Sequence, residues 1–186
     1  ERIANLESHI STVTQRSYTE SAERNRMRNE MQEWTLEALE NGTFDEDTAQ
    51  EIADICGFKG NEVMLLSSKK LNVAPATTHI SLKDVPNKIS QKSLCNTIST
   101  VHSELKKKFK ITCPKITLTG LNPHSGEDGE FGDEEIRTIR PAIKKMQGLG
   151  ISLKGPIPAD TAFTPKIMRN TDCYLTMYHD QGLAPF

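Results

Sequence analysis

Three of the five histidines directly follow runs of residues that predict β-strands, and imidazoles in such positions can bind a metal ion. They are His79 after residues 71–77, His124 after 115–121, and His179 after 173–178. The carboxyl ends of parallel strands meet at one edge of a sheet, so the three imidazoles are expected to converge there. Three neutral imidazoles with one coordination position left for substrate form a catalytic divalent-metal site. Spacing alone leaves open the alternative of three unrelated loop histidines.

Two carboxylates accompany these histidines. Asp160 lies in the proline-rich stretch 155–161, and Asp180 directly follows His179. A carboxylate beside a ligand histidine can orient the imidazole through its second ring nitrogen, or assist proton transfer. Asp160 is therefore a candidate catalytic residue in one of these two roles. An ordinary turn or helix cap is the alternative for both residues.

A glycine-rich stretch, residues 120–132, surrounds His124 and leads into a predicted helix capped by Asp133. Exposed backbone N–H groups in such a loop can receive an anion such as phosphate. The stretch contains neither a G-x-G-x-x-G pattern nor a P-loop, so it does not identify a nucleotide site.

The elements that must position these residues alternate between strand and helix. Predicted strands cover 62–66, 71–77, 115–121, 151–153 and 173–178, and predicted helices cover 90–109, the stretch after 133 (kinked or restarted at Pro141) and 165–169. The helix at 90–109 carries one apolar face, and its lysine-rich end suits the helix dipole. This alternation predicts an α/β fold with parallel neighbouring strands in residues 61–186.

Residues 1–60 differ from the rest of the chain. They contain no proline and hold 6 Lys+Arg against 13 Asp+Glu, a net charge of −7, whereas residues 61–186 carry +5 (17 against 12). Amphipathic spacing predicts helices here, without recognisable chemistry. We therefore expect two parts: a helical segment of unassigned family at 1–60 and an α/β domain at 61–186. The helices either pack on a neighbour or mediate protein contacts.

The overall composition excludes several classes of protein. No apolar run is long enough for a transmembrane helix, and no secretory signal opens the chain. A net charge of −2 gives no reason to expect nucleic acid or a membrane as partner. Four widely spaced cysteines without a C-x-x-C pair predict reduced thiols and a cytoplasmic location.

Five motifs occur in order within residues 62–186, and together they resemble the 4-hydroxythreonine-4-phosphate dehydrogenase family of vitamin B6 biosynthesis. The motifs are ATTH at 76–79, LKDVP at 82–86, GLNPHSGE at 120–127, GPIPADT at 155–161 and MYHDQGL at 177–183. The resemblance covers 125 of the 186 residues.

The resemblance implies an α/β/α sandwich of two domains, of which this chain holds a part, with the active site in the cleft between them. It implies a homodimer with a metal site at the dimer interface, ligated by His79, His124 and His179. The metal is zinc, magnesium or cobalt. The implied reaction is NAD- or NADP-dependent oxidation of 4-phosphohydroxy-L-threonine, followed by decarboxylation to 3-amino-2-oxopropyl phosphate. A related phosphorylated hydroxy acid is the alternative substrate.

The chain departs from the family pattern in several places. The family's GHTE motif is absent from residues 1–60, and the sequence ends at Phe186, where the family usually continues at once with a lysine that contacts substrate. Asp128 and Glu130 replace a common glycine and histidine. We therefore expect the isolated 186 residues to have little or no activity. The alternative is a non-catalytic remnant or fusion whose N-terminal helices mediate protein contacts.

Overall fold

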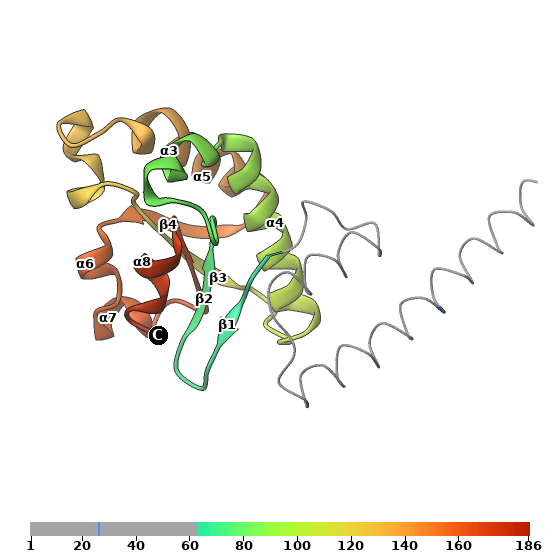
Figure 1. Ribbon diagram of the computed structural model, residues 1–186. Helices are drawn as coiled ribbons and strands as arrows, with labels where there is room; N and C mark the ends of the chain where they lie inside the picture. The colour runs from blue at the N-terminus through green and yellow to red at the C-terminus, as the bar shows by residue number, and fades with distance from the viewer. Residues whose placement is uncertain (1–25, 27–62) are drawn as a thin grey trace, which may run out of the picture. The chain divides into compact units, whose positions relative to one another are not determined.

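The computed structural model describes Arg26 and residues 63–186, and Figure 1 shows the latter as the coloured ribbon. The predicted helical segment 1–60, and with it the proposed boundary near residue 60, lies outside the described residues. Within 63–186 the chain forms an α/β fold around a mixed five-stranded sheet. The fold class predicted from the alternation of strands and helices is confirmed at this level.

The sheet places its last strand in the middle. The strands are β1 (Leu66–Ser67), β2 (Asn72–Pro75), β3 (Lys115–Thr119), β4 (Ser152–Ile157) and β5 (Cys173–Thr176), in the order β1-β2-β5-β3-β4. The pairs β2–β5, β5–β3 and β3–β4 are parallel, and only β1 runs antiparallel to β2. The predicted parallel neighbours are confirmed, so the connections after β2, β3, β4 and β5 begin at one edge of the sheet.

Short helical segments connect the strands, and only two of the described helices are longer than seven residues. The segments are η1 (Leu82–Asp84), α3 (Val85–Lys88), α4 (Gln91–Lys107), η2 (Pro123–Gly129), η3 (Glu135–Ile139), α5 (Arg140–Gly148), α6 (Ala159–Ala162), α7 (Pro165–Met168) and α8 (His179–Leu183). The longest, α4, begins with a capping box: the Ser90 hydroxyl accepts from the Ser93 N–H, and the Ser93 hydroxyl accepts from the Ser90 N–H, both at 3.0 Å. These bonds satisfy N–H groups that have no partner inside the helix.

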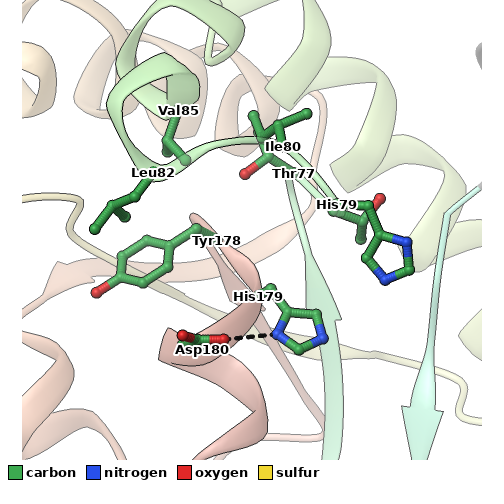
Figure 2. Close-up of a pocket in the computed structure, with 9 residues that line it drawn as sticks. Thr77, His79, Ile80, Leu82, Val85, Tyr178, His179 and Asp180 are labelled. Carbon is green, nitrogen blue, oxygen red and sulfur yellow. Dashed lines mark hydrogen bonds and ion pairs between the residues drawn. The ribbon is translucent and has the colours of Figure 1, made fainter.

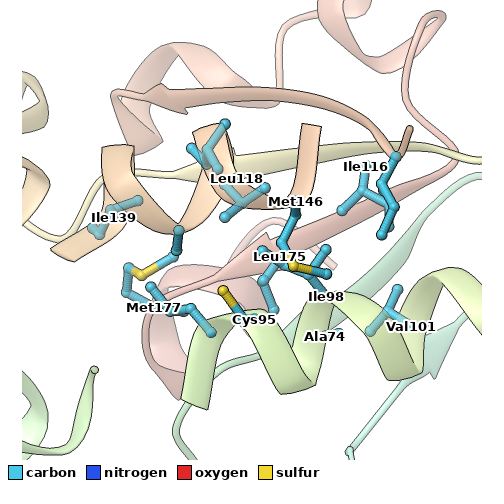
Figure 3. Close-up of a cluster of buried hydrophobic side chains, with 14 of the residues drawn as sticks. Ala74, Cys95, Ile98, Val101, Ile116, Leu118, Ile139, Met146, Leu175 and Met177 are labelled. Atoms are coloured by element: carbon cyan, nitrogen blue, oxygen red, sulfur yellow. The ribbon is translucent and has the colours of Figure 1, made fainter. Parts of the chain in front are cut away.

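The three inner strands β2, β5 and β3 are buried on both faces, which explains their apolar residues. On one face the buried side chains of α4 and α5 pack against the sheet, as Figure 3 shows for Ile98, Met146 and Leu175. On the other face Val73 and Tyr174 pack with Ala162 of α6. Each fully buried Leu or Ile contributes about 1.5–3 kcal/mol, so this two-sided burial fixes the strand order that positions the loops.

Strand β4 is longer than predicted. It includes Gly155 and Pro156, which the sequence suggested were part of a loop. The pairing with β3 passes from Thr117–Lys154 to Thr119–Ile157, so two residues of β4 lie opposite the single Leu118. This is a β-bulge, in which one strand holds an extra residue and bends. The strand pattern missed it because glycine and proline usually end strands.

The predicted cap at Asp133 is wrong. No side-chain cap forms there, and the Asp133 carboxylate pairs with Arg137 instead. The helix begins with the π-helical turn η3, and α5 follows with Pro141 in its first turn. The proline lacks an N–H group, so a restart of the helix at this point is physically reasonable.

The described cysteines Cys95, Cys113 and Cys173 are free thiols, as predicted. Burial, with a smaller contribution from the Asp172 charge, raises the pKa of the Cys173 thiol to about 12. Cys173 is therefore a core residue and not a nucleophile. Among the residues that the structure describes, no helix is long and apolar enough to cross a membrane.

Candidate metal centre

A pocket of about 340 Å³ lies where the chain leaves β2 and β5. Two loops line it, the one after β2 and the one after β5, with residues 77–80, Leu82, Val85 and 178–180. The two loops are tied together because the Thr77 hydroxyl donates a 2.7 Å hydrogen bond to the Met177 carbonyl. The pocket therefore depends on the adjacency of β2 and β5, which are about a hundred residues apart in sequence.

His79 and His179 face each other across this pocket (Figure 2). Their ring centres are 5.8 Å apart and the planes are inclined by 50°. Two imidazoles that bind one tetrahedral metal through nitrogens at ~2.0–2.1 Å have ring centres roughly 5–6 Å apart. The pair therefore has a spacing suitable for holding one metal ion between them.

His179 is oriented by the neighbouring carboxylate. Its Nδ1 lies 2.7 Å from Asp180 Oδ1, the contact drawn as a dashed line in Figure 2. A carboxylate on one ring nitrogen fixes the tautomer and directs the other nitrogen, here Nε2, toward a metal. The sequence left this role open between Asp160 and Asp180, and the geometry favours Asp180.

His124 lies apart from this pair. It is exposed on η2, after β3, and its ring centre is 5.8 Å from that of Phe131. It does not line the pocket of His79 and His179. Among the described residues, no group of three or more His, Cys, Asp or Glu side chains is arranged to hold a metal ion. The chain brings two of the three predicted ligands together, and the set of three stays a prediction.

The backbone around His124 has an unusual conformation. Residues 124–128 all have positive φ, from 42° at Glu127 to 81° at Gly126, and form one left-handed turn. For residues other than glycine, this conformation costs roughly 1–2 kcal/mol each. Such strain persists only where surrounding contacts over-determine the backbone, and it is often found at functional sites.

Replacing Asp128 with glycine is expected to stabilise the chain by about 0.5–1 kcal/mol, because glycine adopts this φ of 57° without strain. Asp128 contributes little itself, since its side chain is 92% exposed and its ion pair with Arg140 is long at 3.6 Å. Urea unfolding measures the change. Glu130→Gly is the matched control: Glu130 has φ −67°, so this substitution should destabilise the chain. Equal effects of the two substitutions would contradict the strain argument.

Asp160 lies in the first turn of α6, directly after β4, and its side chain is exposed. Its helix α6 contacts η2, so Asp160 is on the His124 side of the sheet edge. It does not line the pocket of His79 and His179. Its predicted roles, orientation of a ligand or proton transfer, therefore stay predictions.

Two residues that the sequence analysis missed hold the start of the His124 loop. Glu135 is fully buried, and its Oε1 accepts from the N–H groups of Leu121 (2.7 Å) and Asn122 (2.8 Å). Gln181 donates through Nε2 to the Gly120 carbonyl at 2.7 Å. The two N–H groups bonded to Glu135 are not available to an anion, so the geometry argues against the phosphate site suggested for this loop. The only signal in the sequence for this role of Glu135 is its place among polar residues at the start of the predicted helix.

Comparison with known proteins gives the relationship of the chain. The family model described as "Pyridoxal phosphate biosynthetic protein PdxA" matches residues 35–186. This match begins earlier in the chain than residue 62, where the resemblance seen in the sequence begins. A 4-hydroxythreonine-4-phosphate dehydrogenase of Yersinia enterocolitica is 52% identical over 121 residues, which are 65% of this chain and 37% of that protein. The chain thus spans little more than a third of the length of this curated relative.

Two crystal structures share the fold. The 4-hydroxythreonine-4-phosphate dehydrogenase of Burkholderia phymatum aligns with a TM-score of 0.69 and 37% identity, covering 80% of this chain and 45% of that one. A terephthalate 1,2-cis-dihydrodiol dehydrogenase of Burkholderia xenovorans aligns with a TM-score of 0.67 and 27% identity, covering 81% and 53%. Similar folds therefore occur in dehydrogenases that are named for different substrates.

Proposed function

Because the chain belongs to the PdxA family of pyridoxal phosphate biosynthetic proteins, we propose that it carries the metal site of a 4-hydroxythreonine-4-phosphate dehydrogenase. The whole enzyme oxidises 4-phosphohydroxy-L-threonine with NAD or NADP, and loss of carbon dioxide then gives 3-amino-2-oxopropyl phosphate. The identity of 52% to the Yersinia relative supports this substrate over the dihydrodiol of the more distant structure. The proposed location is cytoplasmic.

The observation that carries the proposal is the facing pair of His79 and His179 with Asp180 behind it. Neutral imidazoles suit zinc, and they also bind cobalt. A divalent cation held by His79 and His179 would supply Lewis acidity to an alcohol or ketone oxygen of the substrate. The protein's own contribution is to hold His179 in one tautomer through Asp180, and to hold the two loops together through Thr77.

We propose that His124 completes the ligand set from a second copy of the chain in a homodimer. Its separation from the other two histidines supports a shared site. The exposed apolar side chains of Phe131 and Ile136, which are 47% and 44% exposed, lie on the same connection after β3. Apolar side chains of this size beside a ligand are suited to burial against a partner.

The glycine-rich loop after β3 does not fit a nicotinamide cofactor. It lacks the dinucleotide pattern, and the Glu135 carboxylate takes two of its N–H groups. NAD or NADP is therefore assigned to the whole enzyme without naming residues among 63–186, and no step is derived through it. In the same way, we propose that the described sheet is part of the larger α/β/α sandwich of the family.

Cobalt titration at two protein concentrations tests the proposal. If His124 comes from a second copy, His124→Ala is expected to weaken Co²⁺ binding by roughly 10- to 100-fold, and dilution of the unmodified chain is expected to weaken it too. Sedimentation measured on the same samples reports the dimer. A Co²⁺ affinity that changes neither on dilution nor in His124→Ala would contradict a shared site. Absence of any metal binding would favour the non-catalytic alternative, in which the N-terminal segment mediates protein contacts.

A further inference from the structure

The backbone at Gly120–Asn122, which leads into the His124 turn, is held by side chains from two other elements. Glu135 of η3 accepts from the backbone N–H groups of Leu121 and Asn122, and its Oε2 accepts from the Asn122 side-chain amide at 3.0 Å. The carboxylate is completely buried. Burial without hydrogen bonds would be costly for a carboxylate, so these bonds fix the relative position of loop and carboxylate.

Two glycines of the loop pack so closely against this carboxylate that neither position has room for a side chain. A Cβ atom on Gly126 would lie 2.7 Å from Glu135 Oε2, and one on Gly120 would lie 3.0 Å from Glu135 Oε1. Both distances are closer than ordinary van der Waals contact. The loop sequence and Glu135 are therefore fitted to each other, which goes beyond a chance surface contact.

Gln181 connects the same backbone to the loop of His179. Its Nε2 donates to the Gly120 carbonyl at 2.7 Å, while its Oε1 accepts from the Thr119 hydroxyl (2.6 Å) and the Met177 N–H (2.8 Å). Two of these bonds join α8 to the end of β3, and the third joins α8 to the residue that follows β5. Gln181 is two residues after His179, so it links the position of one histidine loop to that of the other.

We propose that Glu135 and Gln181 are positioning residues for His124: they fix the Gly120–Asn122 backbone from which the left-handed turn projects the imidazole. Neither residue lines the His79 and His179 pocket. Glu135 acts on a metal through His124, whereas Gln181 also bonds to Met177, two residues before His179. The strained turn requires such support, because without it residues 124–128 relax to ordinary backbone conformations.

We call the hydrogen bonds of Glu135 and Gln181 to the Gly120–Asn122 backbone the clamp. Amide hydrogen exchange in the metal-free chain tests the clamp directly. Glu135→Met keeps the size of the side chain and removes its oxygens. It is expected to accelerate exchange at Leu121 and Asn122 at least tenfold, relative to the core amide of Leu175. Glu135→Gln keeps one acceptor oxygen and should restore most of the protection. Unchanged exchange in Glu135→Met would overturn the proposal, whatever the chain does with metal.

A double-mutant cycle with His124→Ala tests the link to the metal. The inference here rests on the proposed metal site. Glu135→Met and Gln181→Met are each expected to weaken Co²⁺ binding about tenfold. When His124 is already alanine, Glu135→Met should have no further effect, and Gln181→Met should keep only the smaller effect of its bond to Met177. Additive losses would mean that the clamp does not act through His124, and would overturn this part. If Glu135→Met does not fold, Gln181→Met carries both measurements.

Thr117→Val is the matched control for a lost buried hydrogen bond. Thr117 is buried in β3, and its hydroxyl bonds to that of Thr171 at 2.7 Å, away from the His124 loop. The Thr117→Val substitution should lower the free energy of unfolding without changing the Co²⁺ affinity or the amide exchange of Leu121 and Asn122. If the unmodified chain binds no Co²⁺ at all, the proposed function fails, and the clamp is then decided by amide exchange alone.

Discussion

Replacing His79 and His179 together with alanine is expected to lower the affinity of the chain for Zn²⁺ or Co²⁺ by at least about 1,000-fold, since loss of even an outer partner costs ~10–100-fold. The two rings face each other with centres 5.8 Å apart, and in the proposed site both donate directly to the ion. The remaining pocket residues are hydroxyl, apolar and carboxylate side chains, which replace imidazole poorly for zinc. Isothermal titration calorimetry measures the change.

His102→Ala is the control for this prediction. His102 lies in α4 and does not line the pocket, and partial burial together with Lys106 lowers its pKa. Its replacement should leave metal affinity unchanged. Asp180→Asn keeps the size of the side chain but weakens the hydrogen bond to His179, so it should give an intermediate loss. Equal affinities for the double variant and the unmodified chain would show that this pair holds no metal.

The largest expected effect on stability belongs to Gly155→Ala, which should lower the free energy of unfolding by about 3 kcal/mol or more. A Cβ on Gly155 would lie 2.4 Å from the Leu118 carbonyl oxygen and 3.2 Å from its carbonyl carbon. Gly155 also has φ +136°, where side chains are strained. Both atoms belong to the backbone of the buried strand β3, so neither can move aside without breaking the pairing with β4.

Gly148→Ala provides the matched comparison. Nothing lies within 4 Å of a Cβ at Gly148, the last residue of α5. Alanine favours helix over glycine by about 1 kcal/mol in a helix interior, so this variant should be neutral or slightly more stable. Urea unfolding of both variants gives the difference. A loss below about 1 kcal/mol for Gly155→Ala would mean that the strands shift easily around the bulge.

Local patterns in the sequence were sufficient to predict the parallel strands and the approach of two of the three histidines. Apolar spacing predicted the buried face of α4, where Leu94, Ile98 and Leu105 are almost fully buried. The position of each histidine after a strand followed from the rule that ligands gather at the carboxyl ends of parallel strands. That rule predicted the proximity of His79 and His179, which lie close together because β2 and β5 are neighbours.

Features that depend on contacts distant in sequence were not predictable in this way. The sequence does not reveal that the Glu135 carboxylate turns inward to the loop at Leu121, or that Gln181 bonds to Gly120, 61 residues away. Gly155 and Pro156 suggest a loop by local preference, and only pairing with Leu118 makes them part of a strand. The left-handed turn that carries His124 was not predictable either, because no local preference of Ser125 or Glu127 indicates it.

The central position of β5 has a consequence for synthesis of the chain. Residues of β2 and β3 leave the ribosome long before Cys173–Thr176, yet the two strands never pair directly and each waits for β5 between them. Until then both present unpaired inner edges, which invite pairing with other chains. Insertion of the last strand covers these edges and, in the same event, delivers His179 beside His79. Pairing with β5 therefore completes the sheet and brings the candidate metal pair together in one event.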